Sequence, residues 1–160
     1  MDEPYLSRML EDTVAPPVIA RMRASFAARD AASAERAAQG YAILEQSLRK
    51  LDAAGARIIL GCDTGLEDHF FGYAEQKELE LMTAAGMSPM NVIVAATSRA
   101  AQYLGVSDGG ALTAGKRADF LVLDANPLDD IRNTRRIAAI YVGGDIVDRA
   151  ALRRALQKSN

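Results

Sequence analysis

A single short apolar run at residues 57–61 most constrains how this chain can fold. The run follows a helix-forming stretch that ends at Gly55, and a polar loop comes directly after it. Apolar runs of this length between a helix and a loop are typical of a strand buried in a parallel sheet. We therefore predict a parallel strand at residues 57–61, with Cys62 and Asp63 at its carboxyl end.

Helical patterns precede this predicted strand. Pro16 favours the first turn of a helix that extends to about residue 26, because proline is tolerated there. Asp30 is a typical N-cap residue for the next helix, which Gly55 is expected to end. Apolar residues recur along that second helix at helical spacing: Tyr41, Leu44, Leu48 and Leu51.

More helices are predicted after the strand and its loop. Residues 73–85 form one, with Leu79 and Met82 on the same face. Ser88 and Pro89 favour the start of another, as its cap and its first helical residue. Met87 and Val92 have the spacing of a hydrophobic staple at that start. A further turn or two is expected between residues 97 and 104.

The period changes in the last third of the chain. Residues 118–123 and 137–142 have the composition of strands, and Gly143-Gly144 predicts a hairpin turn into residues 145–147. Gly115 favours a bend before the first of these strands, and Asp119 is expected to bond that turn. A short polar helix at residues 149–157 completes the pattern.

Charge and cysteine content narrow the functional classes. Lys and Arg total 19 against 21 Asp and Glu, so no basic excess favours a nucleic-acid surface. Cys62 is the only cysteine, which excludes an internal disulfide and fits a reducing compartment. No apolar run is long enough to span a bilayer, and residues 1–10 mix charged and apolar side chains. We expect a soluble cytoplasmic protein with neither nucleic acid nor membrane as a partner.

Asp63 lies where parallel α/β proteins build their sites, at the carboxyl end of the predicted strand. The loop has the sequence Gly61-Cys62-Asp63-Thr64-Gly65. A carboxylate in this position can ligate zinc or take a proton from a metal-bound water. The alternative is that Asp63 only caps the loop through its own backbone.

The neighbouring residues do not complete a metal site by themselves. His69 is the only histidine, and it could contact substrate or donate a proton, or be an ordinary loop residue. Zinc sites usually need three or four ligands, often several histidines, so one His and one Cys make a self-sufficient site improbable. Cys62 fits best as an inert thiol buried at the strand end.

In their order and spacing, several segments resemble the amidohydrolase superfamily, in the branch with imidazolonepropionase-like and Xaa-Pro dipeptidase-like enzymes. The resemblance covers nearly the whole chain. Its motifs are the stretch 55–65, Glu78-Leu79-Glu80-Leu81-Met82, Ala85-Gly86-Met87-Ser88-Pro89, Ala95-Ala96-Thr97, Leu104-Gly105, the stretch 110–128, and Tyr141-Val142-Gly143-Gly144. Ala114 stands where the family commonly has proline.

The resemblance implies an α/β fold: the C-terminal part of a (β/α)₈ TIM barrel, plus strands of a small composite β-sandwich domain. Residues 1–108 would form the last helices and the final strand of the barrel. Residues 109–150 would supply β-strands of the sandwich, and residues 151–160 a C-terminal helix or tail.

The resemblance also implies a function: metal-dependent hydrolysis of carbon–nitrogen bonds in a small amide or dipeptide-like substrate. In the family, the aspartate that closes the last strand binds the metal and handles the proton of the attacking water. That role transfers to Asp63, with Thr64, Gly65 and His69 as candidate substrate contacts.

No other metal ligand transfers, because the family's histidines lie on earlier strands. We expect zinc or another divalent metal in the complete enzyme, with this chain alone binding none. The chain is then a fragment, half of a split enzyme or a truncated product, and its partner is an N-terminal half or another copy of itself. The alternative is a non-catalytic helical and β module that only associates with a partner.

Overall fold

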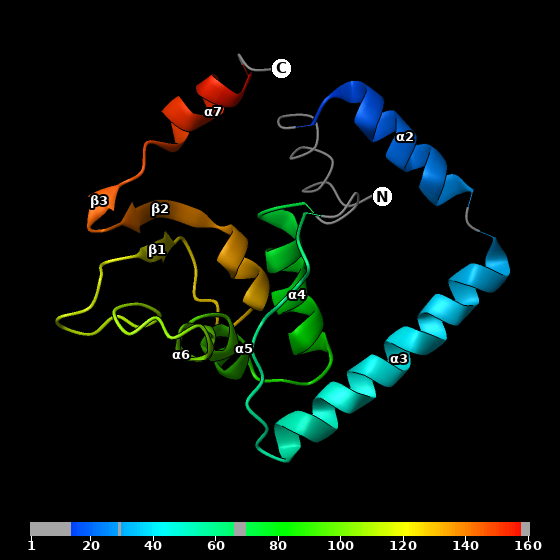
Figure 1. The fold of residues 1–160 in the computed structure, drawn as a ribbon, viewed down its shortest axis with the longest axis horizontal. Coiled ribbons are helices and arrows are strands. Elements are labelled where there is room, and N and C mark those ends of the chain that lie inside the picture. The colour runs from blue at the N-terminus through cyan, green and yellow to red at the C-terminus, as the bar shows by residue number, and fades with distance from the viewer. Residues whose placement is uncertain (1–13, 29, 66–69, 158–160) are drawn as a thin grey trace.

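The computed structural model describes residues 14–28, 30–65 and 70–157. Helices fill the first two thirds of this part, and a small sheet and a last helix follow (Figure 1). The elements are α2 (Pro16–Ala27), α3 (Ala31–Ala53), α4 (Tyr73–Ala84), α5 (Pro89–Ala96), α6 (Ser98–Tyr103), β1 (Phe120–Leu123), the 3₁₀ helix η1 (Ile131–Arg135), β2 (Ile137–Val142), β3 (Asp145–Ile146) and α7 (Arg149–Gln157).

The helix starts expected from capping residues are confirmed. The Asp30 carboxylate accepts a hydrogen bond from the backbone N–H of Ser33 at 2.6 Å, at the start of α3. The Ser88 hydroxyl accepts one from the N–H of Asn91 at 3.2 Å, and Pro89 is the first residue of α5. These caps satisfy amides that have no partner inside the helix.

The predicted parallel strand at residues 57–61 is wrong, because the segment forms no strand. Its backbone contact with the rest of the fold is one hydrogen bond, from Leu60 N–H to the Ala95 carbonyl at 3.3 Å. A strand exists only when a neighbouring strand pairs with it, and none lies beside this segment among the described residues. The described part of the chain therefore contains no barrel.

The hydrophobic core lies where α4, α5 and η1 meet. Its most deeply buried large side chains are Met87 and Val92, with exposed fractions of 2% and 0%. Their burial together agrees with the predicted hydrophobic staple at the start of α5. The other core members are Leu79, Met82, Ala95 and Ile131, with Leu48, Ile58, Leu60, Ile93 and Ala96 packed against them. The apolar run at 57–61 thus packs on the core without joining a sheet.

The described strands form one antiparallel sheet in the order β1-β2-β3. Phe120 pairs with Tyr141, and their rings stack with centroids 4.5 Å apart. The register shifts between Val122 and Leu123, which is a local irregularity in β1. The predicted strands are confirmed, β2 with the predicted bounds and β1 and β3 with shorter ones. The described residues supply no second sheet that would complete a sandwich.

The hairpin between β2 and β3 turns at two glycines, as predicted. Gly143 and Gly144 have φ values of 62° and 91°, which favour glycine and match the twist of the flanking strands. The carboxylate of Asp119 accepts a hydrogen bond from the N–H of Gly143 at 2.7 Å. Asp119 therefore ties the β2–β3 hairpin turn to the start of β1. We had expected it to bond the earlier turn at Gly115.

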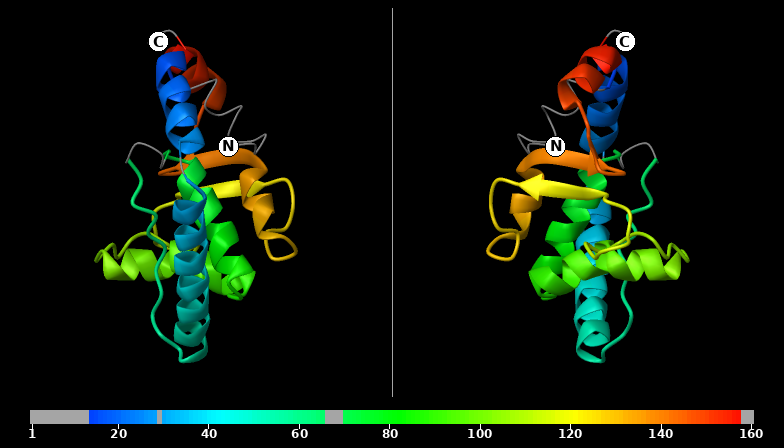
Figure 2. Two further views of the ribbon diagram at one scale, coloured as in Figure 1. Left: turned by 90° about the vertical axis from the view of Figure 1, so that its right-hand side faces the viewer. Right: turned by 90° about the vertical axis from the view of Figure 1, so that its left-hand side faces the viewer.

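The long helix α3 runs along one side of the molecule and α7 lies far from it, on the other side of the sheet (Figures 1 and 2). α3 contains no buried residue, although Leu48 packs against the core. Within the described ranges, no helix combines the length and the apolar character needed to cross a membrane.

Candidate functional site

Asp63 lies in the loop that connects the segment 57–61 to α4. Its φ of 51° makes it the one described non-glycine residue with a left-handed backbone. Aspartate tolerates this conformation better than most residues, but the conformation still carries strain and is concentrated at functional sites. The Asp63 side chain is exposed, whereas its neighbours Cys62 and Thr64 are half-buried.

The Asp63 carboxylate takes no part in holding its own loop. Among the described residues, no hydrogen-bond donor or cation contacts it. The alternative interpretation, in which Asp63 serves only to cap the loop, therefore lacks support in this geometry. The carboxylate is left accessible at the surface of the described part of the chain.

Side chains on both sides of Asp63 hold the loop instead. The Thr64 hydroxyl donates to the Glu75 carboxylate, with 2.6 Å between Thr64 Oγ1 and Glu75 Oε1. Cys62 Sγ lies 2.9 Å from the same hydroxyl oxygen. The thiol of Cys62 is thus half-buried and hydrogen-bonded, and not the fully buried thiol at a strand end that we expected.

The structure says less about the three predicted substrate contacts, Thr64, Gly65 and His69, than about Asp63. Gly65 is exposed with a φ of 109°, and a side chain there would meet the ring of Phe71 at 3.5 Å. Thr64 already uses its hydroxyl proton in the bond to Glu75. His69 lies outside the described residues.

Glu75, in the first turn of α4, holds the Asp63 loop through Thr64, and the sequence analysis did not single it out. Its second carboxylate oxygen accepts a hydrogen bond from the backbone N–H of Gly72 at 2.7 Å. Burial acts to raise the pKa of the Glu75 carboxyl, but hydrogen bonds from Thr64, backbone amides and Cys62 together hold it below its ordinary value. The spacing of Gly72 and Glu75, which is that of a capping box, was the available signal.

The expected metal would need several His, Cys, Asp or Glu side chains close together. Across the described ranges, no three His, Cys, Asp or Glu side chains lie close enough together to hold a metal ion. Zinc usually requires three or four such ligands. The described residues therefore do not form a metal site of three or more ligands by themselves.

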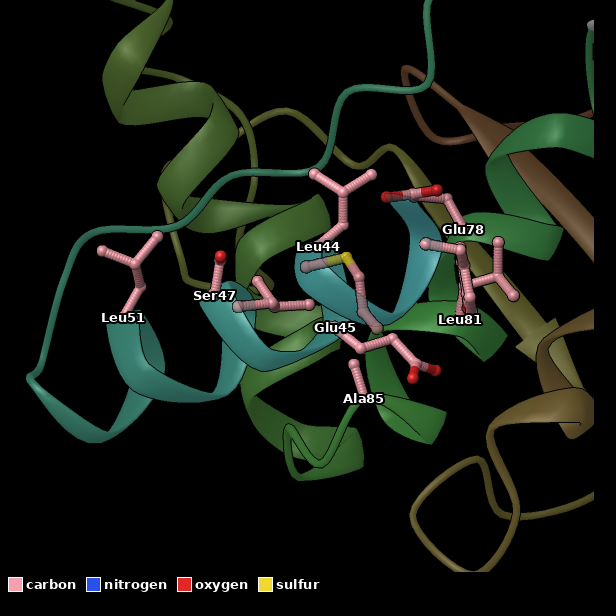
Figure 3. Close-up of a pocket in the computed structure, with 10 residues that line it drawn as sticks. Leu44, Glu45, Ser47, Leu51, Glu78, Leu81 and Ala85 are labelled. Atoms are coloured by element: carbon pink, nitrogen blue, oxygen red, sulfur yellow. The ribbon is translucent and has the colours of Figure 1, made fainter. Parts of the chain in front are cut away.

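A separate apolar groove of about 360 Å³ lies between α3 and α4. Leu44 and Leu51 reach it from α3, and Leu81 and Ala85 reach it from the facing α4 side (Figure 3). Residues 62–65 do not line it. The groove therefore lies between the two helices and is separate from the Asp63 loop.

Comparison with known protein families shows to which family this chain is related. The profile of the amidohydrolase family matches residues 13–147, which is most of the chain. The chain belongs to the amidohydrolase family. An imidazolonepropionase from Deinococcus radiodurans is 39% identical over 61 residues, which are 36% of this chain and 15% of that protein. The family resemblance drawn from the motifs is confirmed.

Solved amidohydrolase-type structures match the described fold. A putative prolidase from Bifidobacterium longum is 41% identical, with a TM-score of 0.59, over 70% of this chain and 29% of its own length. Phenylurea hydrolase B is 37% identical, with a TM-score of 0.61, over 65% of this chain and 26% of its own. This chain therefore spans less than a third of the length of each of these relatives.

Proposed function

We propose that this chain supplies the C-terminal part of a metal-dependent hydrolase that cleaves carbon–nitrogen bonds. The observation that carries the proposal is the family match over residues 13–147, within which Asp63 presents an exposed carboxylate on a strained loop. In the proposed whole protein, residues 1–108 complete a (β/α)₈ barrel. Residues 109–150 add strands to a composite β-sandwich.

The names of the relatives support a proposed substrate class. The similar structures include a phenylurea hydrolase, a putative prolidase and an Xaa-Pro dipeptidase. A phenylurea and an Xaa-Pro dipeptide both contain a carbonyl carbon bonded to nitrogen. We therefore propose a small amide or dipeptide-like substrate for the protein to which this chain contributes.

Asp63 is proposed as one metal ligand and as the group that moves the proton. Its carboxylate would accept a proton from the attacking water and donate it to the leaving nitrogen. The remaining ligands of zinc, or of another divalent metal, must come from outside the described residues. Thr64, Gly65 and His69 are the proposed substrate contacts.

Exposed apolar surface supports a partner for this chain. Leu121 and Val122 on the edge strand β1 are 46% and 41% exposed. We propose that the barrel portion, or a second copy of the chain, covers this edge and the segment around Ile58. A cytoplasmic location is proposed with it, supported by the single Cys62.

A chimera tests the role of Asp63. The part of the Bifidobacterium prolidase that matches this chain would be replaced by this chain, and both zinc content and hydrolysis of Xaa-Pro dipeptides measured. We expect near-stoichiometric zinc in the chimera and none in the isolated chain. Asp63→Asn should lower kcat by about 10²–10⁴, the usual contribution of a general acid–base group.

The control is Asp145→Asn, which removes an exposed carboxylate on β3 and should leave kcat unchanged. Full activity of Asp63→Asn in an active chimera would contradict the proposed role. A folded chimera that neither binds zinc nor hydrolyses substrate would favour the alternative, a non-catalytic module.

The isolated chain is expected to self-associate through its open sheet edge. Unpaired edge strands with apolar side chains pair readily with other chains. Light scattering at rising concentration should give a mass above 17.2 kDa, and Leu121→Lys should return it toward the monomer. Leu112→Lys, at a 76% exposed position outside the sheet, is the matched control. A monodisperse wild-type monomer would refute the expectation.

A further inference from the structure

Three side chains form an ordered chain of hydrogen bonds beneath Asp63. A carboxylate only accepts hydrogen bonds, so the single Thr64 hydroxyl proton is committed to Glu75, 2.6 Å away. The Thr64 oxygen can then act only as acceptor toward Cys62, 2.9 Å away. Thr64 therefore donates to Glu75, and the Cys62 thiol lies within hydrogen-bonding reach of both the Thr64 oxygen and the Glu75 carboxylate.

Glu75 is itself a fixed anchor for this chain. It belongs to the first turn of α4, where the helix dipole favours a negative charge. Its second oxygen is occupied by the N–H of Gly72 at 2.7 Å. Both carboxylate oxygens are therefore held, one by the helix start and one by the loop.

The anchored residues flank Asp63 directly in sequence. Cys62 and Thr64 are half-buried and bonded to each other, while Asp63 between them is exposed. Closing a contact across one intervening residue restricts the backbone of that residue. Asp63, which lies between the two bonded residues Cys62 and Thr64, has a positive φ of 51°.

We propose that Glu75 is a positioning residue for Asp63: through Thr64 it holds the 62–64 backbone in the left-handed conformation that presents the Asp63 carboxylate. Thr64 is a link, because its hydroxyl donates to Glu75 and its oxygen contacts Cys62, on the other side of Asp63. The expected effect of Glu75 on the reaction rate rests on the proposed function of Asp63. Its expected effect on the backbone conformation of Asp63 does not.

The conformational part is tested by NMR spectroscopy on the full chain. Backbone chemical shifts and the Cα–Hα coupling of Asp63 report the sign of φ, and relaxation reports its order. Wild type should show positive φ and an order parameter near ~0.85, and Thr64→Val and Glu75→Gln should average toward negative φ with a value below ~0.6. Thr64→Ser, which keeps the hydroxyl, should match wild type.

Two controls separate this effect from general unfolding. Glu35→Gln removes a carboxylate from α3, far from the loop in sequence, and should leave Asp63 unchanged. The buried amides around Val92 should stay protected in every variant that is scored. Unchanged Asp63 shifts and order in both Thr64→Val and Glu75→Gln would overturn the proposal.

Kinetics in the active chimera test the consequence for catalysis. Thr64→Val and Glu75→Gln should each lower kcat at least about tenfold, since small misplacements of a reacting group cost up to ~10² in rate. Glu75→Gln, which removes no proposed substrate contact, should do so with little change in KM. Thr64→Ser should restore the rate. If the NMR result holds while Asp63→Asn remains active, the proposed function fails and the conformational role stands. If Asp63→Asn is inactive while Thr64→Val is fully active, positioning by Glu75 is refuted.

Discussion

Replacing Arg135 by methionine is expected to lower the free energy of unfolding by about 3 kcal/mol, since it leaves the buried partner Glu80 without its main cation. Arg135 Nε lies 2.7 Å from Glu80 Oε1, and the two side chains are only 10% and 15% exposed. The guanidinium also lies over the Tyr73 ring at 5.5 Å. Lys77, 3.4 Å from Glu80, compensates in part, which places the effect at the lower end of the range for broken buried pairs.

Urea unfolding measures this loss, and the same element offers a control. Arg132→Met breaks an ion pair with Asp130 in which the side chains are 73% and 36% exposed. Exposed pairs contribute less than about 1 kcal/mol. The double variant Glu80→Met/Arg135→Met should regain most of the stability, because the carboxylate that would be left without Arg135 is removed as well, and Lys77 is partly exposed to solvent. Equal losses in Arg132→Met and Arg135→Met would contradict the assignment.

The second large effect is expected at Gly110, where an added methyl group has no space. A Cβ at this position would lie 2.5 Å from Ala101 Cβ and 2.9 Å from the Thr97 carbonyl oxygen. Because backbone and buried atoms cannot move away easily, overpacking of this kind costs about 1–3 kcal/mol. The φ of 76° adds about 1 kcal/mol more for alanine, so we expect a total loss near ~3 kcal/mol.

Gly115→Ala isolates the steric part of that loss. Gly115 has a similar φ of 85°, but nothing lies within 4 Å of its Cβ position. It should therefore lose only about 1 kcal/mol in urea or thermal unfolding. A Gly110→Ala variant as stable as Gly115→Ala would show that the loop can move away from the start of α6.

Features decided by neighbouring residues along the chain were predictable. The caps at Asp30 and Ser88 and the Gly143-Gly144 turn depend on local hydrogen bonds and backbone preferences. The strand at 57–61 was not predictable in the same way, because a strand is completed by a partner and not by its own residues. The same limit applies to Leu44, which has helical spacing yet is 68% exposed on α3.

In the candidate site, too, the sequence predicted a residue with a local signal and missed one that depends on a distant contact. Asp63 was found from a short motif in its loop. Glu75 was missed because its bond to Thr64 joins residues 11 positions apart and depends on how α4 approaches the loop. Periodicity places Glu75 on a helix but does not show which loop its carboxylate reaches.

The exposure of α3 has a consequence for how the chain opens. This helix has 23 residues and no buried side chain, and its contacts with the core elements include Leu48 and the Asp52–Asn91 hydrogen bond, both near its end. A helix without tertiary support is only marginally stable in water, so local unfolding free energies fall toward its unattached end. α3 can therefore unwind from Ala31 toward Leu48 while the core around Val92 stays closed. This end of α3 would rearrange at a low free-energy cost when another surface meets this side of the molecule.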